Sequence, residues 1–211
     1  VWIDTDKIII NNKMILWSND LYNTIEKIVT KNNRLEYLEG IKITKGNKVE
    51  ERFRTTDKSK GKTILLKGED IRKYRNLESD LMSVREEPTI SEAYYIQEVS
   101  KEIRCGISNN VCPLDSVLVI EYEDDWIMYL LNNQIIDKIY NIACSTNYMV
   151  GYAQVRYPRK TLSIKNLPIP YDINELRKLK ECVSEEDANQ IILKAYGITE
   201  EDIKNIMEYK E

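Results

Sequence analysis

One amphipathic segment limits the folds open to this chain. From Asp124 or Asp125 to about Cys144, apolar residues recur at helical spacing, at Ile127, Leu130, Leu131, Ile135, Ile139 and Ile142. Side chains three and four positions apart share a helix face, so we expect one long helix here. The chain before it consists of short β-like runs separated by turns. This order predicts an α+β domain, with a mixed, mostly antiparallel twisted sheet packed against a long helix.

Local signals place the other elements. Ser18 or Asn19 is suited to cap a helix that runs to about Lys31, and Asp70 is placed to cap the segment 71–74. Near the C-terminus, Ser184 begins and Gly197 ends a short helix. Strand-like patterns cover 35–53, with a turn at Gly46-Asn47, and also 63–66, 94–103 and 117–122; a turn is expected over 106–110 and a polar loop over 55–62. We expect residues 1–171 to form the main domain and residues 172–211 a small helical appendage.

The absence of histidine excludes several kinds of chemistry. With no histidine among 211 residues, a Ser-His-Asp or Cys-His catalytic site and a mixed Cys/His zinc site are not possible. The four cysteines, at 105, 112, 144 and 182, have no CxxC spacing, which favours buried free thiols in a reduced, cytoplasmic protein. We therefore expect no metal site and no catalytic residue.

The apolar runs are short, and the chain opens in the middle of a pattern. No run approaches the roughly 18 residues that span a bilayer, so we expect no membrane contact. The first residue is Val1 rather than methionine, which favours a fragment of a longer protein. Further domains of that protein would lie upstream.

Charge is distributed unevenly along the chain. The net charge of −4 argues against unspecific binding to nucleic acid. However, residues 40–75 hold twelve lysines and arginines against five acidic residues, and residues 145–170 hold four against none. Residues 76–130 hold twelve acidic residues against three basic ones. Two basic segments in an acidic chain could form one basic face, or they could be solvated loops.

Three stretches carry a family resemblance. They are GIKITKGN at 40–47, LLKGEDIRKY at 65–74 and YYIQEVSKEIR at 94–104. In this order they resemble the C-terminal specificity domain of TaqI-like and Eco57I-like adenine-N6 DNA methyltransferases of restriction–modification systems. The LNN sequence at 131–133 and the AYGITEEDI sequence at 195–203 are also similar to that family, while GYAQVR at 151–156 is similar to the end of type I recognition domains.

The resemblance implies a target-recognition domain that binds double-stranded DNA. Catalysis would come from an upstream methyltransferase domain of the same chain, which would use S-adenosylmethionine. An Asn-Pro-Pro-Tyr-type loop is absent here, because the nearest string, NLPIPY at 166–171, has the wrong spacing. The fragment itself is therefore not expected to be an enzyme or to hold a cofactor.

Donors suited to phosphates and base edges supply the candidate DNA contacts. They fall into three clusters: Lys42, Lys45, Asn47, Arg54 and Lys60; Arg104 and Asn109; and Gln154, Arg156, Arg159 and Lys160. Two alternatives remain open at this point. One is a half-specificity subunit of a type I system, and the other is a protein-interaction module without affinity for DNA.

Overall fold

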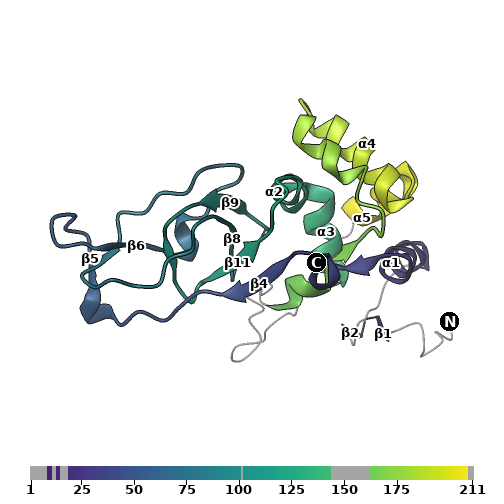
Figure 1. Ribbon diagram of the computed structural model, residues 1–211. Helices are drawn as coiled ribbons and strands as arrows, with labels where there is room; N and C mark the ends of the chain where they lie inside the picture. The colour runs from purple at the N-terminus through teal and green to yellow at the C-terminus, as the bar shows by residue number, and fades with distance from the viewer. Residues whose placement is uncertain (1–8, 11–12, 15–18, 101, 144–161, 209–211) are drawn as a thin grey trace.

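The computed structural model describes residues 9–10, 13–14, 19–100, 102–143 and 162–208. Figure 1 shows a sheet in the middle of the molecule, with most helices at one end and short strands at the other. None of the helices within these ranges is long and apolar enough to cross a bilayer.

The central sheet is antiparallel throughout. Its strands lie in the order β4 (Lys42–Lys45), β11 (Val117–Glu121), β8 (Ala93–Gln97) and β9 (Cys105–Ser108). Successive side chains of a strand face opposite sides of a sheet. Accordingly, Leu118 and Ile120 of β11 join a core formed with the helices, while Val117 and Val119 join a second core on the other face. Burial on both faces explains why this strand is uniformly apolar.

A second sheet lies at the end of the molecule opposite α1, α4 and α5 (Figure 1). Its strands lie in the order β10 (Cys112–Pro113), β6 (Thr63–Leu66), β7 (Met82–Ser83) and β5 (Arg54–Thr55). Only the β10–β6 pair is parallel. We call residues 51–63 and 80–87, which include β5, β7 and the loop before β6, the tip. The mixed, mostly antiparallel α+β prediction is confirmed.

The expected long helix is instead two helices, α2 (Trp126–Asn132) and α3 (Gln134–Ala143). The break is at Asn133, whose backbone is extended with ψ of 139°. Its side-chain oxygen accepts the Ile135 N–H at 2.8 Å and so caps α3. The apolar spacing continues across the break, and this is why periodicity alone predicted one helix.

The remaining helices pack into the same core as α2 and α3. They are α1 (Asn19–Lys31), the 3₁₀ helix η6 (Leu176–Glu181), α4 (Glu185–Tyr196) and α5 (Glu200–Glu208). The predicted caps of α4 are confirmed: the Ser184 hydroxyl accepts the Asp187 N–H, and Gly197 has a φ of 60°. Small two-stranded pairs are β1 (Ile9–Ile10) with β2 (Lys13–Met14), and β3 (Asn33–Arg34) with β12 (Pro168–Ile169).

Asp202 ties α5 to α1. Its carboxylate accepts the Thr199 N–H at 2.9 Å and the Thr24 hydroxyl at 2.8 Å, and it lies 3.6 Å from the Lys27 ammonium. Burial alone would raise the pKa of this carboxyl, but the hydrogen bonds from Thr199 and Thr24 lower it below its ordinary value. The charged form of Asp202 therefore stabilises the contact between these helices.

Several local expectations need correction. Asp70 does not cap a helix over 71–74; it closes the 3₁₀ turn η4 (Gly68–Asp70) by accepting the Lys67 N–H. The strand-like pattern at 35–53, expected to break at Gly40 and at Gly46-Asn47, yields only the strand β4, flanked by the 3₁₀ helices η2 (Leu35–Tyr37) and η3 (Glu51–Phe53). The turn expected over 106–110 is in part strand, because β9 continues to Ser108. Gly46 is needed for close approach rather than for a turn, since a Cβ there would overlap the Leu114 carbonyl oxygen.

Candidate nucleic-acid interface

The loop before β6 presents a row of cations at the tip. Lys58 and Lys60 are 74% and 73% exposed, and Lys62 is also exposed. Lys58 lies 3.0 Å from Asp80 and Lys60 lies 3.3 Å from Asp57. Ion pairs this exposed contribute about 0–1 kcal/mol, so both ammonium groups can exchange their partner for a phosphate.

Asp57 shapes this loop. Its carboxylate accepts the Ser59 N–H at 3.1 Å and the Ser59 hydroxyl at 2.7 Å, while its own N–H donates to the Thr55 hydroxyl. The hydrogen bonds from Ser59 lower the pKa of the Asp57 carboxyl, with a further contribution from Lys60. The loop that carries the lysines is therefore internally bonded.

Two guanidinium groups lie over one aromatic ring at the tip. Arg52 lies over the Phe53 ring at 4.7 Å from its centroid, and Arg85 also lies over this ring. The Phe53 carbonyl accepts the Val84 N–H at 2.9 Å, which joins the two segments. Arg85 was not among the predicted contacts. The available signal was an isolated arginine within an otherwise acidic stretch, and that signal is weak.

Two other predicted DNA contacts, Lys42 and Lys45, form ion pairs with acidic residues of the 76–130 segment. Lys42 lies 2.7 Å from Glu121, its register partner on β11, and Lys45 lies 2.7 Å from Glu98. Cross-strand pairing is the usual way in which opposite charges stabilise a sheet. This pairing explains how an acidic segment and a basic segment coexist, and it reduces the net positive charge on this face.

Asn47 and Arg54 serve the fold locally. Arg54 donates from Nε and Nη2 to the Val49 carbonyl at 3.0 and 2.6 Å. The Asn47 N–H donates to the Pro113 carbonyl at 2.7 Å, and its side-chain amide lies 3.9 Å from the Cys112 sulfur. Asn109 is exposed beside Asn110, whose φ is 53°. A role in DNA contact stays a prediction for these residues.

The third predicted cluster lies outside the described residues. It comprises Gln154, Arg156, Arg159 and Lys160. The predicted contacts of the first two clusters are therefore the ones that can be placed.

Two of the three motif stretches line one groove of about 360 Å³, and the first is joined to it by an ion pair. Lys67 and Gly68 line it from the second stretch, and Gln97 and Glu98 from the third; Lys45 of the first is paired with Glu98. The Gly68 N–H donates to the Ser116 hydroxyl at 3.0 Å, and the Glu98 N–H donates to the Ser116 carbonyl at 2.9 Å. Segments separated along the chain thus form a single structural unit.

The cysteines that can be placed are free thiols. Cys105 and Cys112 are buried, and Cys182 is half-buried. Burial raises the pKa of all three thiols. Within the described part of the chain, no three Cys, Asp or Glu side chains are placed to share a metal ion.

No protein-family model matches the chain, and no curated protein sequence matches it. Among solved structures it is similar to the HsdS subunit from Thermoanaerobacter tengcongensis, with a TM-score of 0.43 and 10% identity over 90% of this chain and 47% of that one. It is also similar to a chain of a type I restriction–modification system (TM-score 0.46, 11% identity, 89% and 49% covered). A third likeness is to the type IIL restriction–modification enzyme MmeI in complex with DNA (0.43, 13%, 86% and 34% covered).

The chain spans between a third and a half of the length of these three structures. The second and third belong to restriction–modification systems. At this level of likeness, the function of the chain has to be argued from its own residues.

Proposed function

We propose that this chain is a DNA target-recognition domain of a restriction–modification system, which positions a duplex for catalysis by another domain. The observation that carries the proposal is that the second and third motif stretches line one groove, to which the Lys45–Glu98 ion pair joins the first, beside the tip with its exposed cations. These are the stretches that resemble the specificity domain of adenine-N6 methyltransferases. Their convergence in space supports a common structural role rather than a chance likeness of short strings.

The electrostatics support local rather than general binding to DNA. Phosphate binding requires positive charge, and this chain carries −4 overall. The tip offers lysines in weak ion pairs together with an aromatic ring under two guanidinium groups. A contact confined to this region would position the duplex, and selectivity would then come from donors that reach base edges.

We further propose that the parent protein is an adenine-N6 DNA methyltransferase of the cytoplasm. An upstream domain of the same chain would bind S-adenosylmethionine and hold the flipped adenine. The supporting observations are the motif resemblance and the lack of histidine and of an Asn-Pro-Pro-Tyr-type loop in these 211 residues. In this arrangement the domain contributes duplex binding but no reacting group.

The test compares two triple variants of equal charge change. Lys58→Ala, Lys60→Ala and Lys62→Ala together remove the tip lysines. Lys178→Ala, Lys180→Ala and Lys194→Ala remove three lysines from η6 and α4, where acidic residues also pair with them. Binding of a duplex to the full chain is measured by fluorescence anisotropy over a series of salt concentrations.

The slope of log K against log salt is negative, and each phosphate contact that is lost reduces its magnitude by about 0.9. The tip variant is expected to lose about 2 to 3 units of slope, while the helix variant keeps the slope of the unaltered chain. An equal effect of both variants would show unspecific attraction. The complete absence of binding by the unaltered chain at low salt would reject DNA recognition and favour a protein-interaction module.

A further inference from the structure

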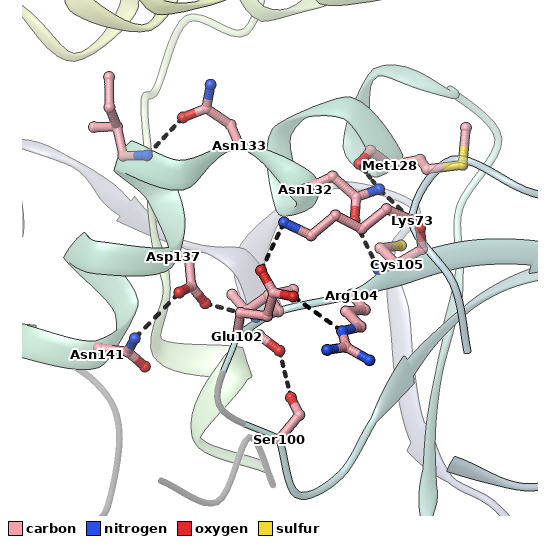
Figure 2. A network of polar contacts seen from close by, with 12 residues as sticks. Lys73, Ser100, Glu102, Arg104, Cys105, Met128, Asn132, Asn133, Asp137 and Asn141 are labelled. Atoms are coloured by element: carbon pink, nitrogen blue, oxygen red, sulfur yellow. Dashed lines mark hydrogen bonds and ion pairs between the residues drawn. The ribbon is translucent and has the colours of Figure 1, made fainter. Parts of the chain in front are cut away.

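The backbone on both sides of Arg104 is held by side chains of the helix pair (Figure 2). The Ile103 N–H donates to the Asp137 carboxylate at 2.6 Å. The Cys105 N–H donates to Asn132 Oδ1 at 2.9 Å, and the Cys105 carbonyl accepts from Asn132 Nδ2 at 2.7 Å. Asn132 is 4% exposed, so these bonds form in a protected environment. Residues 103–105 therefore have a fixed position relative to α2 and α3.

The Arg104 side chain is held as well. Its Nε lies 3.0 Å from Glu102 Oε1, and the second oxygen of the same carboxylate lies 3.0 Å from the Lys73 ammonium. The hydrogen bond from Lys73, with that from Arg104, lowers the pKa of Glu102, so this group is ionised at neutral pH. The Ser100 hydroxyl donates to the Glu102 carbonyl.

One edge of the guanidinium remains open. Arg104 is 41% exposed, and its two terminal nitrogens have no partner among the described residues. A guanidinium held at Nε presents these two nitrogens as a planar fork, which matches two acceptors side by side. Guanine offers this pair, O6 and N7, in the major groove.

We propose that Arg104 reads a guanine through its two terminal nitrogens, with Glu102, Asn132 and Asp137 as positioning residues. The inference rests on the proposed function and names the group that recognises one base. A guanidinium meant for phosphate needs no fixed orientation, and an ionised carboxylate beside it repels the DNA backbone. The Arg104–Glu102 pair therefore weakens the general attraction to DNA but fixes the orientation of the guanidinium. This is the arrangement expected at a contact with a base.

The experiment measures selectivity and affinity separately. The full chain and its variants are each used to select duplexes from a random pool, and the preferred duplex is then compared with its single-base changes by anisotropy. Arg104→Lys keeps the charge but loses the fork. Arg177→Lys is the matched control, because the Arg177 Nε also lies 3.0 Å from a carboxylate, that of Asp124.

Arg104→Lys is expected to reduce discrimination at one G·C position by about tenfold or more, with the salt slope nearly unchanged. Glu102→Gln is expected to bind unrelated duplexes more tightly while discriminating less at that same position. Arg177→Lys leaves both quantities unchanged. A merely structural ion pair would alter the unfolding midpoint and would not change the preference at a single base position.

Two negative results have different meanings. If the unaltered chain selects a sequence and Arg104→Lys retains full discrimination, the role of Arg104 is wrong while DNA recognition stands. If the unaltered chain selects no sequence, both proposals fail. Unfolding curves for each variant show whether a lost preference follows from lost structure.

Discussion

Asn132 is the residue whose truncation best tests how the central sheet is joined to the helices. Its amide accepts from the Cys105 N–H and donates to the carbonyls of Cys105 and Met128, at 2.9, 2.7 and 3.0 Å. In Asn132→Ala the Cys105 N–H becomes a buried donor without a partner, which costs about 1–3 kcal/mol. The Cys105 carbonyl still accepts the Tyr74 N–H at 3.1 Å, so losing its bond from Asn132 costs less free energy.

These terms add up to an expected loss of about 2–4 kcal/mol in the free energy of unfolding. That is a large share of the 5–15 kcal/mol typical of a domain. Urea unfolding followed by far-UV circular dichroism measures it, and hydrogen exchange reports on the Cys105 amide. The control is Asn189→Ala on α4, where a half-buried amide makes one side-chain bond to Asn133 and the loss should stay below about 1 kcal/mol. A loss below about 1 kcal/mol for Asn132→Ala, with full protection of the Cys105 amide, would refute this reasoning.

Three further substitutions test other parts of the fold by chemical unfolding. Tyr95→Phe is expected to be neutral or to stabilise by up to about 1 kcal/mol, because the Tyr95 hydroxyl is buried with no hydrogen-bond partner in the described part of the chain; a loss above that amount would contradict this expectation. Asp202→Asn is expected to lose about 1–2 kcal/mol at pH 7. Because folding lowers the pKa of Asp202, its ionised carboxylate stabilises the fold fully above the unfolded pKa of about 3.9, and this stabilisation disappears as pH falls through the folded pKa. The free energies of unfolding of the variant and of the unaltered chain should therefore converge in acid. Gly46→Ala should lose about 2 kcal/mol or more because its methyl group meets the Leu114 carbonyl of the backbone, whereas Gly61→Ala meets side-chain rather than backbone atoms, those of Met82, and should lose less; equal losses would contradict this reading of Gly46.

Local signals predicted the elements that depend on local physics. The apolar run at 63–66 is a strand with those bounds, and the helix expected to end at about Lys31 ends there. Ser184 and Gly197 begin and end α4 because a cap needs only a side-chain oxygen or a left-handed residue at one position. In each of these cases neighbouring residues are sufficient to decide the structure.

The break between α2 and α3 could not be predicted in the same way. Helical spacing of apolar side chains continues through it. Asn133 caps α3 through its near neighbour Ile135, but it also bonds to α4, and Asn132 binds β9. The contacts with β9 and α4 depend on the folded arrangement of distant segments.

The candidate DNA contacts also divide into features that neighbouring residues decide and features that depend on distant segments. Exposed lysines in a loop at 55–62 were predictable from composition, and the tip carries them. The set formed by Lys73, Glu102 and Arg104 depends on two segments about thirty residues apart meeting at the edge of the sheet. A list of basic residues therefore named Arg104 as a candidate but could not show how it is held.

Selection from a random duplex pool tests the central claim most directly. The full chain is incubated with the pool at physiological salt, and the bound duplexes are recovered, amplified and sequenced over several rounds. The proposal predicts one short recurring sequence, bound about a thousandfold more tightly than a scrambled duplex of the same composition. Recovery of all sequences in proportion to their abundance, or of none, would contradict the claim that this chain recognises a DNA target.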